Sequence, residues 1–387
     1  MNTTQTRIDQ EQRLTALQEH GLHEPLSAED LGAQVEGFAF RLLGSAVAMM
    51  DLATIRIGKD LGLYDALAEQ GPTTSDGLAG LCQVDERYAR EWLEQQAVTG
   101  ILEVEDVSAA AGDRRYSLPV AHVAVLVDRT SPAYLGALGN VTDMTLVMGA
   151  LVDSFRDGSG VPWAHYGDGA RTMQSELNRP GYVTSLAQEW LPAMPDIEQR
   201  LRSGGPARVA DVACGTGWSS IAFALAYPDV VVDGFDADDA SIADARRNAA
   251  EAGVGDRVHF EVRDAVEPGL AEGAYDLVAA FECVHDLSQP VETLSAMRRL
   301  ARDDGFVLVA DNAVDEDFTA PGSEIDRLIY ASSVLVCLPT GRAHAHSAET
   351  GAVMRPSTFE AYARAAGFTK VAVADVPHPF WRFYRPS

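Results

Sequence analysis

The sequence predicts an α/β protein, with a doubly wound parallel sheet in its C-terminal half and a mostly helical winged-helix region before it. Two observations carry this prediction. After Arg208, short apolar runs alternate with helical patterns, as in parallel sheets covered by helices on both faces. Earlier in the chain, three helical patterns are followed by two short strand patterns, which is the element order of a winged helix-turn-helix.

Charge and length limit the classes of function. The chain has 387 residues, with 30 Lys and Arg against 57 Asp and Glu, so its net charge is −27. Such a chain repels nucleic-acid phosphates and anionic lipid surfaces, and we expect neither as a partner. At about 150 residues per domain, the length predicts two or three domains.

The location predicted for the protein is the cytoplasm. None of the four cysteines forms a CxxC pair, which argues against a zinc knuckle or a disulfide framework. The first residues are polar and resemble no signal peptide. The best apolar run, LLGSAVAMMDLATI, is interrupted by Asp51 and is shorter than the ~20 residues that a membrane helix needs.

The N-terminal elements divide into a polar arm at 1–30 and a winged-helix domain at 31–125. Apolar residues recur at helical spacing over 32–68. Thr74 or Ser75 can cap a second helix, and Asp85 a third. Residues 101–104 and 116–118 then predict two short paired strands.

This winged helix is a poor candidate for DNA binding. A recognition helix needs Lys, Arg, Asn and Gln side chains facing the base edges. The helix after Asp85 instead has more acids than arginines. We therefore expect the domain to serve packing or homodimerisation.

Linking helices and an active-site lid are predicted over 126–182. A helical stretch covers 133–157, and an aromatic, glycine-rich loop covers 162–169. Further helices are expected over 171–202, with breaks near 178–181 and at Pro192 and Pro195.

The sheet domain is predicted over 183–387. Its expected strands are 209–213, 230–236, 258–262, 275–281 and 305–310. Its expected helices begin at Ser219 and cover 241–252 and 290–301. Strands buried on both faces read as continuous apolar runs, as these do.

A glycine-rich turn follows the first strand of this domain. Asp211, Ala213, Gly215 and Gly217 alternate there, and glycines allow the backbone to turn sharply and to approach a ligand. Asp236 ends the next strand, nineteen residues after Gly217, near the offset of an acid that binds ribose hydroxyls. Asp264 and Ala265 follow the third strand, where a carboxylate can accept from an adenine amino group. The pattern predicts a pocket for an adenosyl ligand.

The identity of that ligand follows from what the turn lacks. There is no GxxxxGK[ST] pattern, and the third glycine of a dinucleotide site is missing. Asp211 suits an ammonium group better than a pyrophosphate. S-adenosylmethionine carries such an ammonium and a sulfonium.

These segments resemble successive motifs of class I S-adenosylmethionine-dependent methyltransferases: VADVACGTG at 209–217, GFDADDASIADARRNA at 234–249, residues 264–265, and YDLVAAFECVHDL at 275–287. Together with the winged helix, the chain is similar to small-molecule O-methyltransferases that dimerise through that domain. The resemblance implies a Rossmann-like sheet and S-adenosyl-L-homocysteine as product. Ala213 stands where such families have Gly.

The resemblance also implies residue roles. The cofactor would be bound by Asp211, Ala213, Gly215, Gly217, Asp236, Ala237, Asp264, Ala265, Phe281 and Tyr166. The acceptor would be bound by Leu177, Asn178, Tyr182, Tyr330, Val334 and Met354, on the lid and on the apolar segment after the fifth strand.

A His-Asp pair, His285 and Asp286, directly follows the fourth strand. In the related O-methyltransferases such a pair supplies the general base, and an imidazole is suited to deprotonate a phenol. Asp311 and Glu282 are the candidates for orienting the imidazole. The second acid of the plant enzymes is missing, because the comparable region reads Met354-Arg355-Pro356-Ser357.

No metal is expected. His344 and His346 form an HxH pair, but two histidines do not complete a tetrahedral site.

Three functions remain open at this point. The first is O-methylation of a small molecule in secondary metabolism. The second is N-, C- or S-methylation, or a non-methylating reaction assisted by the same cofactor. The third is a ligand-sensing winged-helix regulator.

Overall fold

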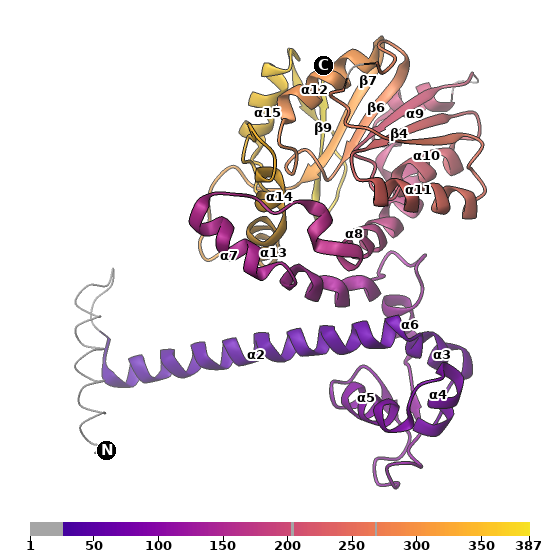
Figure 1. Cartoon of the computed structure of the whole chain (residues 1–387), viewed down its shortest axis with the longest axis vertical. Coiled ribbons are helices and arrows are strands. Elements are labelled where there is room, and N and C mark those ends of the chain that lie inside the picture. The colour runs from indigo at the N-terminus through magenta and orange to yellow at the C-terminus, as the bar shows by residue number, and fades with distance from the viewer. Residues whose placement is uncertain (1–25, 203–204, 268) are drawn as a thin grey trace. The chain divides into compact units, whose positions relative to one another are not determined.

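The computed structural model describes residues 26–202, 205–267 and 269–387 (Figure 1). Most of the polar arm predicted at 1–30 therefore lies outside the described residues. The chain divides into two units, Met1–Ala53 and Thr54–Ser387, with the division inside the first described helix.

That helix, α2 (Ala28–Asp60), is 33 residues long and exposes many large apolar side chains. They include Val35, Phe38, Phe40, Leu42, Leu43, Val47, Met49 and Met50. By length and composition alone α2 could cross a membrane, so the prediction that no segment is long and apolar enough was wrong. Asp51 does not interrupt the helix, because one acid is compatible with a continuous helical backbone.

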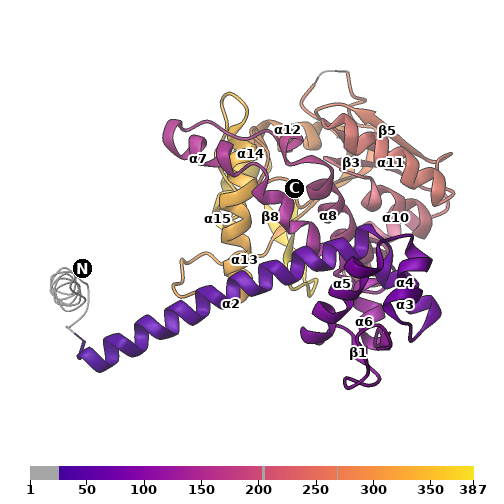
Figure 2. The same ribbon diagram turned by 60° about the horizontal axis from the view of Figure 1, so that its bottom comes forward.

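The predicted winged helix is present. It comprises α3 (Leu63–Gln70), α4 (Ser75–Cys82), α5 (Glu86–Val98), the antiparallel pair β1 (Glu103–Val104) and β2 (Tyr116–Ser117), and α6 (Val120–Leu126). Figure 2 shows α3, α4, α5 and α6 grouped together. Thr74 caps α4 by accepting from the Gly77 N–H, and Asp85 caps α5. Leu78, Leu93 and Tyr116 lie in its apolar core.

The charged side chains of α5 pair with one another. Arg87 forms an ion pair with Glu91, and Arg90 forms one with Glu86. Trp92 packs inward and donates its indole N–H to the Thr54 carbonyl. The arginines are thus engaged with acids of their own helix, which favours packing over base recognition.

The linking region is more continuous than predicted. It contains η1 (Gly136–Thr145), α7 (Met148–Asp157), η2 (Trp163–Tyr166), α8 (Gly167–Pro180), η3 (Gly181–Trp190) and α9 (Pro195–Arg202). The expected loop at 162–169 is largely helical. The expected break near 178–181 is absent, because the chain passes Pro180 by widening from α8 into the π-helix η3.

The main sheet has seven strands in the order β5-β4-β3-β6-β7-β9-β8. Its strands are β3 (Arg208–Val212), β4 (Val231–Asp236), β5 (Val258–Val262), β6 (Tyr275–Phe281), β7 (Ala301–Asn312), β8 (Val371–Val373) and β9 (Trp381–Pro386). The pairs among β3 to β7 are parallel, and β9 runs antiparallel to β7. The strand order reverses between β3 and β6, and the crevice at such a switch point is where doubly wound sheets bind ligands.

Helices cover both faces of this sheet, as Figure 1 shows. One core packs α9, α10 (Trp218–Ala226), α11 (Asp239–Glu251) and η3 against it. The other packs α12 (Pro290–Leu300) and α15 (Pro356–Ala365). A third cluster joins α7 and Tyr166 to α13 (Glu324–Ser332) and η4 (Ser333–Cys337), and α14 (Leu338–Arg342) follows. The predicted fold class is confirmed.

Candidate active site

The turn between β3 and α10 has the backbone shape that its glycines predict. Ala213, Gly215 and Gly217 have φ angles of +54°, +52° and +81°. A Cβ on Gly217 would lie 2.5 Å from Cζ of Phe260, whereas one on Gly215 would meet nothing within 4 Å. Close packing thus requires glycine at 217, while at 215 the backbone angle favours glycine and the space beside it is open.

Asp236, at the end of β4, is tied to this turn. Its Oδ2 accepts from the Gly215 N–H at 2.8 Å, and its Oδ1 accepts from the Asp238 N–H at 2.9 Å. Burial raises the pKa of this carboxyl to about 6, although the two hydrogen bonds favour its charged form and act to lower the pKa. The adjacent Ala237 is exposed.

Asp211, at the end of β3, is almost fully buried. Its Oδ2 accepts from the hydroxyls of Ser219 and Ser220, at 2.6 and 2.5 Å. Burial raises its pKa to about 6. The carboxylate therefore anchors the first turn of α10, a role that the motif did not predict.

The third predicted adenosyl contact lies after β5. Asp264 is exposed, and its Oδ1 accepts from the Val266 N–H at 3.1 Å. Ala265 is buried in the sheet core. Only Asp264 of this pair presents a polar side chain to solvent.

His285 lies just beyond β6 and is held by Asp311 of β7. Nδ1 of His285 lies 2.6 Å from Oδ1 of Asp311, and the His285 backbone N–H points to Oδ2 at 3.3 Å. Both side chains are buried. A carboxylate on Nδ1 fixes the tautomer with its proton there and leaves Nε2 to act as acceptor. Of the two candidate orienters, the structure pairs Asp311 with the imidazole.

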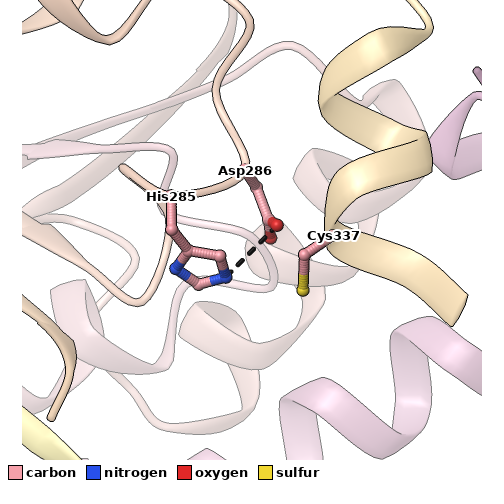
Figure 3. Close-up of side chains that lie close together, drawn as sticks. All are labelled: His285, Asp286 and Cys337. Carbon is pink, nitrogen blue, oxygen red and sulfur yellow. Dashed lines mark ion pairs between the residues drawn. The ribbon is translucent and has the colours of Figure 1, made fainter. Parts of the chain in front are cut away.

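On the other side of the ring, Nε2 faces Asp286 and Cys337 (Figure 3). Nε2 lies 3.2 Å from Oδ1 of Asp286, at ion-pair distance but without the alignment of a hydrogen bond. Burial lowers the pKa of His285, but the charges of Asp286 and Asp311 outweigh it and hold the pKa well above its usual value.

The same three side chains could hold a metal ion, since their donor atoms lie within 4.8 Å of one another. A metal would need the Nε2 lone pair that a base uses for its proton, so the two uses exclude each other. His344 and His346 are exposed and do not contribute to this trio.

Glu282 is bound by the lid and not by His285. Its Oε2 accepts from Nε2 of Gln174 at 2.9 Å and from Nδ2 of Asn178 at 2.6 Å. Its backbone has a φ of +52°, which is unusual for a residue other than glycine. Glu282, one of the two candidates for orienting the imidazole, is thus engaged by two amides of α8, and Asp311 is the carboxylate on Nδ1.

The other predicted residues differ in their surroundings. Tyr182 packs against Phe281 with ring centroids 5.4 Å apart. Tyr166 is buried, interacts electrostatically with Asp286 and Cys337, and donates its hydroxyl to the Leu335 carbonyl. Leu177 is half-buried on α8, Met354 lies in the sheet core, and Tyr330 and Val334 are exposed.

Sequence reasoning missed four residues of this region: Gln174, Ser219, Cys337 and Trp381. Gln174 could have been found, since it precedes Asn178 by one helical turn. Cys337 lies in the apolar segment after the fifth strand, where residues that bind the acceptor were expected. Trp381 is brought in by β9, which the sequence did not predict.

Comparisons with known proteins agree with this architecture. Residues 205–348 match the family described as "Methyltransferase domain", and residues 45–128 match the "Rv2258c-like winged HTH domain". A putative O-methyltransferase from Nostoc punctiforme PCC 73102 superposes with a TM-score of 0.65 at 21% identity, covering 89% of this chain and 98% of that one. Human N-acetylserotonin methyltransferase, solved with SAM, gives 0.62 at 18% identity, covering 90% and 97%. At these identities the likeness concerns the fold.

One curated relative is more similar in sequence over a shorter stretch. The 27-O-demethylrifamycin SV methyltransferase of Amycolatopsis mediterranei (strain S699) is 32% identical over 111 residues. The match covers 29% of this chain, and the chain spans 40% of that relative's length.

Proposed function

We propose that this chain, which joins an Rv2258c-like winged helix-turn-helix domain to a methyltransferase domain, methylates a hydroxyl group of a small molecule. S-adenosyl-L-methionine is the methyl donor and S-adenosyl-L-homocysteine the product. The observation that carries the proposal is the buried His285–Asp311 pair, at the end of the strand that adjoins the glycine-rich turn.

The residues of the turn fit this cofactor. Space is open beside Gly215, and Asp236 holds a carboxylate against the same turn, as ribose hydroxyls require. Asp211 contributes negative charge beneath the turn, although its Oδ2 is engaged by two serines. When bound, the cofactor supplies a methyl group on a positively charged sulfonium.

His285 acts as the general base. Asp311 keeps the proton on Nδ1, so Nε2 accepts the proton of the acceptor hydroxyl as the oxygen gains the methyl group. Asp286 faces the resulting imidazolium at 3.2 Å and stabilises it. Because the pKa of His285 is raised, the base form is more abundant in alkaline solution.

The test is the His285→Ala variant, assayed by mass spectrometry for addition of one methyl group to a panel of phenols. Loss of a general base should lower kcat by roughly 10²- to 10⁴-fold. Binding of S-adenosylmethionine, measured by calorimetry, should change little, because His285 lies on a different strand end from the glycine-rich turn. No binding of the cofactor by the wild type would refute the proposal as a whole.

Retention of near-normal turnover by His285→Ala would instead favour the second candidate, methyl transfer to nitrogen, carbon or sulfur or a cofactor-assisted reaction without methylation. An already nucleophilic acceptor needs no strong base, since positioning alone supplies much of the rate.

We also propose that the protein is a homodimer through its N-terminal domain, acts in the cytoplasm and serves natural-product biosynthesis. The exposed apolar side chains of α2 support the dimer. The rifamycin enzyme of Amycolatopsis mediterranei supports the biosynthetic role by analogy. The acid-paired arginines of α5 and the charge of −27 argue against a DNA-binding regulator. A specific gel shift with genomic fragments would reverse that conclusion.

A further inference from the structure

Glu282 is a half-buried carboxylate that the proposed reaction does not use. It follows β6 directly and precedes His285 by three positions. Its backbone N–H donates to the Ala310 carbonyl of β7 at 2.7 Å, which fixes it at the carboxyl edge of the sheet. Its position is therefore defined by the strands that also position His285 and Asp311.

The backbone of Glu282 is strained. Its φ of +52° belongs to the left-handed region that glycine, asparagine and aspartate occupy most easily. Such outliers persist where the surrounding structure imposes them, and they gather at functional sites. Ala213, on the cofactor turn, is a second outlier of this kind.

Among the described residues, the hydrogen-bond donors to the Glu282 side chain are neutral. Gln174 and Asn178 stand one turn apart on α8 and donate their amide N–H groups to Oε2, and Trp381 is within hydrogen-bonding reach. Within the described part of the chain, no Lys or Arg forms an ion pair with this carboxylate. His285 interacts electrostatically with this carboxylate, but it is already shared between Asp286 and Asp311.

Aromatic rings surround the same strand end. Tyr182 lies 5.4 Å from Phe281 and 5.6 Å from Trp381, measured between ring centroids. Aromatic faces beside a carboxylate attract ammonium groups through the ring quadrupole and the negative charge together. An anion would meet three acids here: Glu282, Asp286 and Asp311.

We propose that Glu282 determines acceptor specificity by binding a protonated amine, so that the acceptor is a cationic molecule bearing both an amine and a hydroxyl. The inference rests on the proposed function. His285 takes the hydroxyl proton, the oxygen gains the methyl group and the sulfonium becomes a neutral sulfide. The amine keeps its proton throughout and serves for binding alone.

The alternative is a purely structural role, in which Glu282 only holds α8 against the sheet through hydrogen bonds. Two variants separate the roles. Glu282→Gln removes the charge but keeps an oxygen that accepts from α8. Asn178→Ala removes one fastening hydrogen bond but keeps the charge.

The probes are tyramine, a cationic phenol, and tyrosol, a neutral phenol of similar size, each added to the full chain with S-adenosylhomocysteine in the cofactor site. Calorimetry measures the affinity for both phenols. In Glu282→Gln, tyramine affinity should fall about tenfold or more and tyrosol affinity less than twofold, because only tyramine carries a charge. Asn178→Ala should change both affinities by the same factor.

Equal losses for the two probes in Glu282→Gln would overturn the inference while leaving the proposed function intact. Failure of S-adenosylhomocysteine to bind the wild type would refute the proposed function itself. If Glu282→Gln does not fold, salt titration of the wild type decides: the preference for tyramine over tyrosol should weaken with ionic strength, and a salt-independent preference would contradict the inference.

Acceptors supply a second readout. Tyramine, tyrosol and 4-hydroxyphenylacetate are phenols of similar size that are cationic, neutral and anionic. The wild type should favour tyramine over tyrosol in kcat/KM, and Glu282→Gln should remove that preference. A wild type that prefers the anionic phenol would also overturn the inference.

Discussion

At the residue scale, His285 illustrates how its neighbours set the properties of a base. The imidazole is buried between two carboxylates, with Asp311 on Nδ1 and Asp286 facing Nε2. Cys283, Cys337 and Glu282 also interact with it electrostatically. Burial alone would lower its pKa, but the two acids reverse the direction. A base whose pKa is raised binds a proton strongly and is free of protons only at higher pH.

This arrangement predicts the effect of Asp286→Asn. Removing one negative charge lowers the pKa of His285, so the unprotonated base becomes available at lower pH. The acidic limb of the kcat/KM profile should therefore shift to lower pH. Initial rates of methyl transfer across a pH series measure the shift.

Asp311→Asn is the matched control. It disturbs the tautomer of the imidazole, so it should depress kcat at every pH instead of mainly moving the limb. An unchanged acidic limb in Asp286→Asn would show that Asp286 does not tune the base.

At the element scale, the turn between β3 and α10 shows two different physical reasons for the presence of a glycine. Gly215 and Gly217 both have positive φ, but only Gly217 has no room for a side chain. The sequence motif predicts the turn but treats the two glycines alike. Distinguishing them requires knowing that Phe260 of β5 packs against residue 217.

Alanine at the two positions should therefore have unequal effects. Gly215→Ala should lower the free energy of unfolding by about 1–2 kcal/mol, the cost of the left-handed backbone. Gly217→Ala should lower it by a further ~1–3 kcal/mol, because the new methyl group overlaps Phe260. Urea unfolding monitored by circular dichroism measures both, and equal losses would contradict the contact with Phe260.

At the scale of the whole molecule, charge and exposed apolar surface indicate different partners. A net charge of −27 disfavours polyanions, whereas α2 exposes a long series of apolar side chains. Such surface is rarely left uncovered in a soluble protein. A second copy of the chain would cover it without opposing the predicted cytoplasmic location.

Adding negative charge to α2 tests whether its exposed apolar side chains form the dimer interface. Phe40 and Leu43 are 67% and 59% exposed, so replacing both with Glu should not disturb the described core. The Phe40→Glu/Leu43→Glu variant should be monomeric where the wild type is dimeric, as measured by light scattering after size-exclusion chromatography.

Gln34→Glu is the control, since it adds charge to exposed α2 without removing apolar surface. A wild type that is monomeric and binds liposomes would contradict the dimer and favour a membrane role for α2.

Prediction from sequence succeeded where the signal is local. Strand β6 was predicted with its observed bounds, and Asp85 caps α5 as expected, because apolar runs and capping oxygens act on near neighbours. Prediction failed where the deciding contacts join residues that are far apart in the sequence. The break expected near Pro180 is absent, and Glu282 is engaged by α8 instead of His285.

The sequence by itself determined the strand–turn–helix pattern, the glycine-rich turn with its acids, and the position of His285 after a buried strand. These features depend on spacing along the chain, which fixes the backbone conformation and the face of a helix or strand on which each side chain lies. Only the tertiary structure decided that Asp311 holds the imidazole, that Asp286 and Cys337 face its other nitrogen, and that Glu282 has neutral partners. Some of those contacts join residues that are 26 to 108 positions apart in the sequence. Others depend on the orientation of neighbouring side chains. Spacing along the chain specifies neither the distant contacts nor the orientations.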